Sequence, residues 1–532
     1  MHSEKNKSIF WQLGLLVVAA FYLVARLWRL SDSCLTFDEI FSVHAAEHGW
    51  SSMFSFVAAD LIHPPLFYAL LKIWILAGGE SLFWLRLFPV VFAALAIAPF
   101  LLLCRELKLT TLETLTAFVF LAVNGALIRY SQEVRMYSPL FCFSLVSLWL
   151  FVRFINYLPI NASTFKELTG FPKNNYIWLF LTNLILIYTH YFGWVVVLSE
   201  LAIFVYLCRG FSTALIRIQR GKRFGAFFCS VILLGLCFLP WAWVVWQAAS
   251  QSEGFSQNLG WAAKPGFVSI WRFVLILNEP FYYQQSSIDA PNILILVLPI
   301  AFICLTAIVL NGFRHRNEAF ILTAFFTIVP VATAFIVSWI SPHSVWGTRH
   351  LIIVFAPFAI LTALAINCLP IKELKIAAFG LIGTLILIAG IRHFSAKPQT
   401  FIWCGWRELA AEADVQTNEL TTIYIFEDDG AYQLWYALKN NPKFNIISID
   451  GYADMPEDKA FFLPRSFDEV KVADKNAIAG DTFYLAFRET AWKPDKQVLQ
   501  DLRARGYEIG KPLEFKAQGV TAFLVPIEKS LR

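Results

Sequence analysis

The chain has 532 residues, of which 58% are hydrophobic and only 15% are charged. This composition excludes an ordinary soluble domain and indicates a protein that crosses a membrane several times. The formal net charge is +5, but the basic residues are spread over short connections and form no single stripe, so nucleic acid is not expected as a partner.

Apolar runs long enough to span a bilayer recur over the first part of the chain. Roughly 20 apolar residues in a helix cross the hydrocarbon core, and the alternating pattern typical of a membrane barrel is missing. The predicted fold class is therefore an α-helical polytopic membrane protein with about 11 transmembrane helices. The predicted spans are residues 9–28, 83–104, 112–130, 137–154, 176–190, 192–208, 225–246, 292–311, 319–340, 351–369 and 376–391.

Basic residues mark alternate connections between these spans. Lys5 and Lys7 precede the first span, and basic residues recur at every second connection, the last of them carrying Lys372 and Lys375. Because positively charged connections stay in the cytoplasm, we expect a cytoplasmic N-terminus and an extracytoplasmic tail after Ile391. This orientation depends on the turn within "YTHYFGW", where one apolar stretch must fold back, and on the short last span.

The tail differs in character, because charges return and apolar runs shorten to strand length. "TTIYIF", "FNIISI", "DTFYLAF" and "TAFLVPI" are typical of strands, and "WRELAAEA" and "DKQVLQDLRARGY" have helical patterns. We expect a transmembrane domain over residues 1–391 and a small extracytoplasmic α/β domain over 392–532. Only Cys34 and Cys404 would be accessible to an oxidising compartment, and the sequence does not favour a bridge between them.

The first outer connection, about residues 30–82, is the most elaborate one. It carries "TFDEIF" and then "HPPLFYALLKIWILAGG", which is expected to form an interfacial helix that begins at the two prolines. The other outer connections are "IRYSQEVRMYSP", "YTHYFGW" and "SPHSVWGTRH". Charged groups near a bilayer are costly, so acids, histidines and arginines that gather on one face predict a functional site.

The order of these motifs resembles the membrane glycosyltransferases of the GT-C class. The residues that carry the resemblance are "DE" after the first span, "HPPLFY" leading to "RLFPVVFAALA", "YSQEVRMYS", "THYFG" and "TRHLIIVFAPFAIL". Within that class the chain is most similar to bacterial members related to dolichyl-phosphate-mannose protein mannosyltransferases and lipid A aminoarabinose transferases. The resemblance covers the part of the chain that holds the predicted spans.

The resemblance implies a glycosyltransferase of the cell inner membrane. Such enzymes take a sugar, here a hexosyl or pentosyl group, from a polyprenyl-phosphate donor on the outer face. They pass it with inversion to an envelope acceptor, which can be a glycan, a lipid or a protein. No cofactor is implied with certainty.

The catalytic residues expected from the resemblance are Asp38 and Glu39. Inverting transfer needs a carboxylate to take the acceptor's proton, and Asp38 matches the family's base. Glu39 would orient Asp38, hold a cation or contact the acceptor. The structural alternative is that Thr36 and Glu39 form a capping box and the acid pair simply begins a helix.

The donor phosphate is expected to meet Arg349, because an arginine at the start of a span combines its fixed charge with free helix amides. Its alternative is snorkelling to the interface. His350 stands where the family usually has tyrosine. Arg135 is available for phosphate or sugar, whereas Glu133 could instead pair with Arg129 along a helix. The full predicted substrate-binding set is His63, Glu133, Arg135, Tyr137, His190, Tyr191, Arg349 and His350.

Two further hypotheses stay open, one about a metal site and one about the function. Asp38, Glu39, His44, His48 and His63 are metal-ligand types, but their spacing fits no standard zinc pattern, so no metal is assigned and a divalent cation remains an alternative. The competing function is a polyprenyl-linked lipid flippase or transporter, whose charged residues would line the midplane. The predicted spans are nearly free of charge there, which favours the enzyme.

Overall fold

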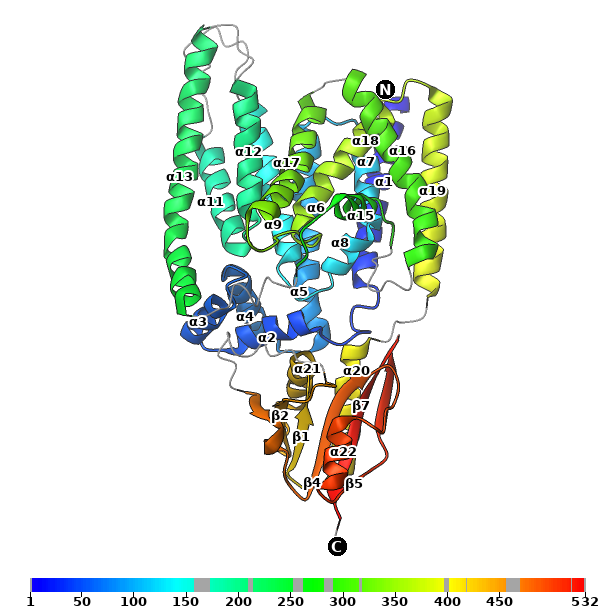
Figure 1. The fold of residues 1–532 in the computed structure, drawn as a ribbon. Helices are drawn as coiled ribbons and strands as arrows, with labels where there is room; N and C mark the ends of the chain where they lie inside the picture. Colours follow the sequence, from blue (N-terminus) through cyan, green and yellow to red (C-terminus); the bar gives the residue numbers. More distant parts are fainter. Residues whose placement is uncertain are drawn as a thin grey trace.

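We describe the protein from a computed structural model that covers residues 2–156, 173–208, 214–251, 262–281, 290–314, 318–396, 401–417, 419–455, 469–517 and 519–530. A bundle of long helices fills most of the molecule, and an α/β domain is attached to one end of it (Figure 1). The N-terminus lies at the opposite end of the bundle and the C-terminus at the tip of the α/β domain (Figure 1). We refer to the end of the bundle beside the α/β domain as its sheet-side end.

Apolar helices occupy every predicted span. Six helices among the described residues are long and apolar enough to cross a membrane, and shorter apolar helices accompany them. The chain is therefore a multi-pass membrane protein. The bundle helices are α1 (His2–Leu27), α5 (Leu82–Leu95), α6 (Ile97–Glu106), α7 (Thr111–Val123), α8 (Gly125–Tyr130), α9 (Tyr137–Asn156), α11 (Lys173–Thr189), α12 (Gly193–Cys208), α13 (Ala214–Gln251), α15 (Phe267–Leu277), α16 (Ala290–Arg314), α17 (Glu318–Ile340), η1 (His350–Val354), α18 (Phe355–Asn367) and α19 (Lys372–Ser395).

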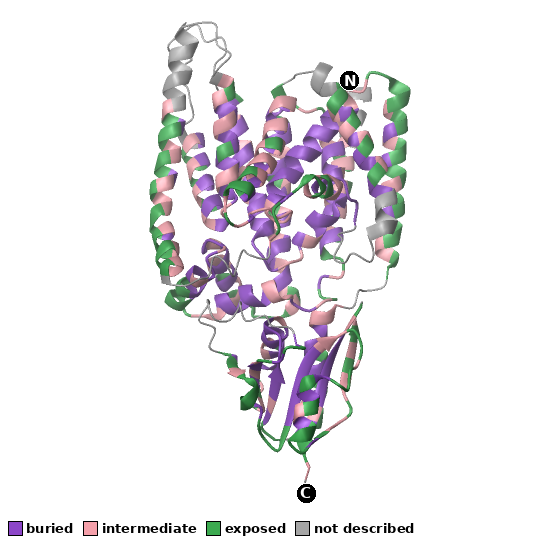
Figure 2. Cartoon of the chain, viewed as in Figure 1, coloured by how far each residue is buried: buried purple, intermediate pink, exposed green. Residues whose placement is uncertain are grey.

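The bundle is buried at its centre and apolar on its periphery. Helices α9 and α18 are almost wholly buried, whereas the described side chains of α13 and α19 are mostly exposed or half-buried (Figure 2). The exposed side chains of α13 are nevertheless apolar, among them Leu236, Trp243 and Trp246. Exposed apolar surface of this extent is what a helix needs on the side that faces lipid.

The predicted turn in "YTHYFGW" is confirmed. Helix α11 ends at Thr189, α12 begins at Gly193, and the amide of Gly193 donates to the carbonyl of His190 at 2.8 Å. A Cβ atom on Gly193 would lie 2.7 Å from the carbonyl oxygen of Leu186, so only glycine fits this reversal. The two spans therefore run in opposite directions, as the orientation argument requires.

The predicted span over residues 112–130 is broken. Asn124 ends α7 and caps α8, its side chain accepting from the amide of Leu127 at 3.0 Å. The side-chain amide of Asn124 donates to the carbonyl of Ile276 at 2.9 Å, at the end of α15, a helix that the sequence did not indicate. A cap that bonds to a distant segment is a tertiary feature, so hydropathy alone did not reveal the break.

Three short helices lie at the sheet-side end of the bundle (Figure 1). They are α2 (Phe37–Glu47), α3 (Trp50–Asp60) and α4 (Leu66–Gly78). Helix α4 is the predicted interfacial helix and begins directly after Pro65, as the two prolines indicated.

The tail forms one mixed sheet with the strand order β3-β2-β1-β4-β7-β5, and β6 pairs with β7. Strands β1, β2, β3 and β4 are parallel, whereas β7 runs antiparallel to β4, β5 and β6. The four predicted strands and two predicted helices are present, and α21, β3, β5 and β6 were missed. The bounds are α20 (Ile402–Gln416), β1 (Thr421–Ile425), α21 (Asp428–Leu438), β2 (Phe444–Asp450), β3 (Lys471–Asp474), η3 (Lys475–Ala477), β4 (Thr482–Glu489), α22 (Gln497–Ala504), β5 (Tyr507–Ile509), β6 (Leu513–Ala517) and β7 (Val520–Lys529).

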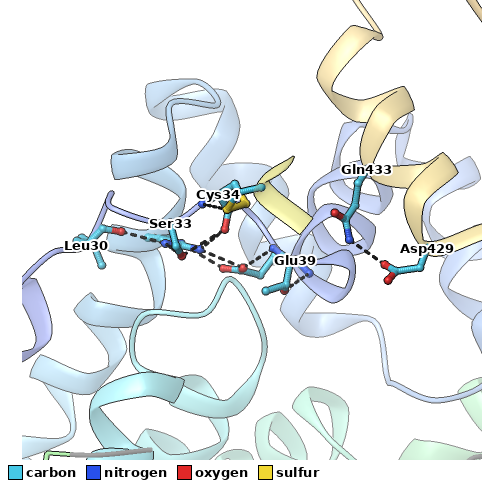
Figure 3. Close-up of a disulfide and its surroundings, with 9 residues drawn as sticks. Leu30, Ser33, Cys34, Glu39, Asp429 and Gln433 are labelled. Atoms are coloured by element: carbon cyan, nitrogen blue, oxygen red, sulfur yellow. Dashed lines mark hydrogen bonds and ion pairs between the residues drawn. A yellow bond between two sulfur atoms is a disulfide. The ribbon is translucent and has the colours of Figure 1, made fainter. Parts of the chain in front are cut away.

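A disulfide joins the α/β domain to the chain segment before α2. Cys34 and Cys404 are bridged across 370 residues of sequence, a bridge that the sequence had not favoured (Figure 3). A link of this span depends on α20 being placed beside the loop that enters α2, which only the tertiary structure decides.

Candidate functional site

Helix α2 begins with the capping box that the sequence suggested. The side chain of Thr36 accepts from the amide of Glu39 at 3.4 Å, and the carboxylate of Glu39 accepts from the amide of Thr36 at 2.8 Å. This reciprocal pair fixes the start of α2 and hence the backbone of Asp38. The capping-box interpretation of the acid pair is therefore correct for Glu39.

Glu39 is fully buried and fully occupied. Besides the cap, its two oxygens accept from the guanidinium of Arg86 at 3.3 and 3.2 Å and from the amide of Val134 at 3.0 Å. Figure 3 shows Glu39 beside the loop that carries Ser33 and Cys34, to which Arg86 also donates. Glu39 thus joins three segments through its hydrogen bonds, and its side chain is not accessible to solvent.

Asp38 pairs with Arg349, which lies 311 residues further along the chain. The Oδ2 atom of Asp38 lies 2.9 Å from Nη1 of Arg349, and the two side chains are 43% and 31% exposed. The main-chain carbonyl of Asp38 accepts from buried Arg135 at 3.0 Å, which also donates to Ser42 at 3.1 Å. One carboxylate and two guanidinium groups from three distant segments therefore meet at the start of α2.

Both arginines keep their charge. Burial opposes the charge of Arg135, but the nearby Asp38 carboxylate outweighs it, so the pKa of Arg135 is raised above its usual value. The Tyr137 hydroxyl, followed by Asp38, likewise raises the pKa of Arg349 against the effect of burial. The site thus offers fixed positive charge beside a carboxylate.

Three histidines line up next to this cluster. The ring of His63 lies 5.4 Å from that of His190, which lies 5.2 Å from that of His350. Burial lowers the pKa of His63 to about 4, although the adjacent Asp60 carboxylate, 3.5 Å away, opposes the shift. Burial also lowers the pKa of His190 well below its usual value, with His350 as the next cause. These rings are neutral near pH 7 and serve as hydrogen-bonding groups rather than cations.

The remaining predicted residues separate into two groups. Glu133 pairs with Arg129 at 2.7 Å, which is the alternative that the sequence left open, and burial raises the pKa of Glu133. Tyr137 is buried close to both arginines of the site. Tyr191 instead accepts from Trp241 of α13 at 3.3 Å and donates to the main-chain carbonyl of Leu61 at 3.5 Å, so its contacts are those of a packing residue.

Several buried polar atoms in this cluster have no hydrogen-bond partner among the described residues. They are Arg135 Nε, Tyr137 Oη, His190 Nε2 and His350 Nδ1. Since Nδ1 of His190 accepts from the amide of Phe192 at 3.0 Å, its Nε2 carries the proton and is a donor. A buried donor without a partner costs about 1–3 kcal/mol, so the cluster is suited to a polar ligand or ordered water.

Sequence reasoning missed two residues that hold the site together. Arg86 anchors Glu39, and Asp60 contacts His63. Asp60 and His63 are three positions apart, a spacing that could have suggested their contact. Arg86 gave no such signal, because its partner lies 47 residues away.

The five residues that the sequence offered as metal ligands do not come together as one site. Among the described residues, the grouping with metal-ligand geometry is His44, His48 and Glu469. Asp38, Glu39 and His63 do not belong to it. Glu469 lies in the C-terminal tail, so no spacing in the first loop could have indicated it.

Comparison with solved structures finds the same architecture at low sequence identity. ArnT from Cupriavidus metallidurans bound to undecaprenyl phosphate gives a TM-score of 0.55 at 12% identity, covering 96% of this chain and 97% of that chain. The chain has the GT-C fold.

Two structures of an Archaeoglobus fulgidus oligosaccharyltransferase are also similar. The form tethered with an acceptor peptide gives a TM-score of 0.51 at 12% identity, over 97% of this chain and 74% of that chain. The apo form gives 0.48 at 14% identity and covers 81% of this chain but 64% of that chain, which is less than two thirds of the archaeal protein. No family model and no curated protein matches the sequence.

Proposed function

We propose that this protein is a membrane glycosyltransferase that moves a sugar from a polyprenyl-phosphate donor to an envelope acceptor, with Asp38 as the base. The observation that carries the proposal is the half-exposed carboxylate of Asp38, held at 2.9 Å from Arg349 beside buried Arg135. A base and two fixed cations are what inverting transfer from a phosphate leaving group requires. The shared fold with ArnT, solved with undecaprenyl phosphate, supports this class of donor.

The proposed reaction is a single displacement. An acceptor hydroxyl oxygen attacks the anomeric carbon of the sugar while Asp38 takes the hydroxyl proton. The bond between that carbon and the phosphate oxygen breaks, and its electron pair stays on the departing polyprenyl phosphate. Asp38 later releases its proton to water, which restores the carboxylate.

Arg349 has two uses in this scheme. Before the donor binds, it holds the carboxylate of Asp38 through the 2.9 Å contact. When the donor phosphate arrives, the guanidinium is placed to donate to phosphate oxygens, because charge-assisted bonds from arginine suit that group. Asp38 then becomes free to accept a proton. Arg135 is positioned by its bonds to the backbone of Asp38 and to Ser42, and its Nε is left for the ligand.

Glu39 is proposed as a positioning residue. It sets the first turn of α2 through its cap and through Arg86, so it acts on Asp38 only indirectly. This role deepens the earlier expectation that Glu39 orients its neighbour, and it leaves no free oxygen for the acceptor.

The proposed orientation places the sheet-side end of the bundle outside the cell. It follows from the basic residues after α6 and in the first turn of α19, which lie at the opposite end. The N-terminus is then cytoplasmic in the inner membrane, and the α/β domain is extracytoplasmic. The presence of the disulfide between Cys34 and Cys404 supports an oxidising compartment on this side.

The test is transfer by purified protein in detergent, with no membrane gradient. A panel of radiolabelled polyprenyl-phosphate hexoses and pentoses is incubated with envelope extract and with wild-type or Asp38→Asn protein. We expect label to leave one donor for an acceptor in the wild-type reaction alone, which identifies the sugar and the acceptor pool together. A folded wild-type protein that leaves every donor intact contradicts the proposal and favours a flippase.

A further inference from the structure

The end of α2 opposite Asp38 faces the α/β domain. His44 lies in the last turn of α2, and His48, four positions later, is the C-cap residue that follows the helix. Their neighbours from the α/β domain are Tyr432 and Trp435 of α21 and Glu469, which precedes β3. The ring centroids of His44 and His48 are 4.7 Å apart, so the two imidazoles are adjacent.

We propose that His44, His48 and Glu469 form a binding site for a zinc-class divalent metal that fixes the α/β domain to α2. One ligand atom from each residue lies within 4.8 Å of the other two. Two imidazole nitrogens and one carboxylate oxygen are a standard three-residue zinc set, with water in the fourth position. This assignment does not depend on the proposed transferase reaction.

The surroundings orient His48 for metal binding. Its Nδ1 lies 2.7 Å from the main-chain carbonyl of His44. A carbonyl can only accept, so Nδ1 carries the proton and Nε2 has the free lone pair. A ligand histidine in metalloproteins typically donates its other nitrogen to a carbonyl or carboxylate in this way. The main-chain carbonyl of His48 also accepts from buried Lys72 at 2.7 Å, which holds the end of α2 in place.

His44 can present its Nε2 with a change of tautomer alone. Its Nε2 lies 2.9 Å from Oε1 of Glu469, and its Nδ1 lies 2.9 Å from the hydroxyl of Tyr432. Without metal, Nε2 donates to the carboxylate and the Tyr432 hydroxyl donates to Nδ1. With metal, Nδ1 donates to the same hydroxyl, which can also accept, and the metal replaces the proton between Nε2 and Glu469.

Zinc requires only small side-chain movements here. Ligand atoms around a tetrahedral zinc are about 3.4 Å apart, given bonds of about 2.0–2.2 Å. The distance between His44 and Glu469 is already shorter than that, and the widest separation is limited to 4.8 Å. Two cations lie nearby. Lys439 pairs with Glu47 and with Glu80, so its charge is partly neutralised. Lys72 donates to the main-chain carbonyls of Ala46 and His48.

The metal would complete a clamp on α2. The disulfide of Cys34 and Cys404 holds the segment before this helix, and the metal would hold its other end to the same domain. A helix fixed at both ends keeps Asp38 in its first turn at a constant position. The metal would therefore act by positioning α2 rather than by contacting substrate.

The test is zinc binding by the full-length protein in detergent. Wild type, His48→Gln and Glu469→Gln are stripped with chelator and dialysed against zinc, and bound metal is then measured by elemental analysis. Glu514→Gln is the control, because Glu514 is a carboxylate of the same domain that lies on β6, outside the grouping. We expect one zinc per wild-type chain and per control chain. The two test variants should lose at least about 100-fold in affinity, since even outer-shell changes cost about 10–100-fold.

A second readout separates ligation from folding. Cobalt in place of zinc gives a visible absorption spectrum typical of its ligands, and His48→Gln should abolish it while tryptophan fluorescence stays native. Zinc should raise the unfolding temperature of wild type and leave that of Glu469→Gln unchanged. Wild-type protein without bound zinc, or variants that retain it in full, would overturn the proposal.

Discussion

The first turn of α2 carries two acid–arginine pairs in opposite environments. Asp38 and Arg349 are 43% and 31% exposed, whereas Glu39 and Arg86 are 0% and 7% exposed. Consecutive helical residues point about 100° apart, so one carboxylate reaches the surface and its neighbour enters the protein. An exposed pair can separate when a ligand binds, but a buried pair cannot lose a partner without a large penalty. The exposed pair is therefore suited to the proposed chemistry, and the buried pair is suited to holding the fold together.

Replacing the exposed acid should abolish function and spare the fold. Asp38→Asn removes the proposed base, so transfer should fall by about 10³-fold, within the range of general base catalysis. Loss of the exposed pair with Arg349 should itself cost less than about 1 kcal/mol. Buried Arg135 keeps the main-chain carbonyl of residue 38 and the hydroxyl of Ser42 as acceptors, so the fold should be retained. Transfer is measured with the labelled donor that wild type uses. Asp32→Asn is the control, since Asp32 pairs with Arg29 in the preceding loop. Normal turnover in Asp38→Asn would remove this residue from the mechanism.

Replacing the buried acid should destabilise the fold. Glu39→Ala leaves Arg86 buried without its charge partner, so the free energy of unfolding should fall by about 3–5 kcal/mol. The matched control is Glu113→Ala, because Glu113 closes the same kind of capping box with Thr110 at an exposed helix start. The control should lose only about 1 kcal/mol. Unfolding in detergent is followed by tryptophan fluorescence, and equal losses for both variants would contradict the distinction.

Lowering the pH should reduce the free energy of unfolding, because the buried side chain of His63 resists protonation. The pKa of His63 is about 4 in the folded protein, below the ordinary value of 6.5. The unfolded chain therefore binds a proton first as the pH falls, and stability present above pH 6.5 is lost progressively down to about pH 4. The loss from this residue should be roughly 3 kcal/mol.

Replacement of His63 isolates this contribution. His63→Asn should show a shallower decline of unfolding temperature between pH 7 and pH 4.5 than wild type. His343→Asn, in the connection between α17 and η1, serves as the control and should follow wild type. An unchanged slope in His63→Asn would mean that other groups govern the acid sensitivity.

The smallest effect is expected at the arginine of the exposed pair. Arg349→Ala should weaken binding of polyprenyl phosphate by about 10–100-fold, the equivalent of one charge-assisted bond worth about 1.5–3 kcal/mol. The affinity of Arg349→Lys for polyprenyl phosphate should fall between that of wild type and that of Arg349→Ala, because lysine keeps the charge without the planar donor pair. Equilibrium binding of labelled lipid phosphate is the measurement. An unchanged affinity in Arg349→Ala would indicate that Arg349 only anchors the chain at the interface.

Most of the fold could be predicted from the sequence, because a membrane span is a local property. Apolar runs of sufficient length matched helices from α1 to α19, and the turn that was predicted within "YTHYFGW" lies between two of them. The break at Asn124 and the helix α15 escaped prediction, since a tertiary contact between them decides both. In the tail, the missed strands β3, β5 and β6 are three to five residues long and carry little pattern of their own.

From the sequence we could predict which residues gather at one end of the bundle, but not which of them contact one another. The sequence gathered Asp38, Arg135 and Arg349 on one side of the membrane by counting spans, and the structure places all three together. It could not separate the roles of Asp38 and Glu39, because their partners Arg349 and Arg86 lie far away along the chain.

Local sequence was enough to predict that this chain spans a membrane and to offer a capping box of Thr36 and Glu39 as one interpretation of the acid pair, because hydropathy and capping depend on nearby residues. Three features could be seen only in the folded chain: which carboxylate stays exposed, the bridge between Cys34 and Cys404, and the contact of His44 with Glu469 across 425 residues. Contacts between distant segments depend on how whole helices and domains pack. No spacing within one loop contains that information.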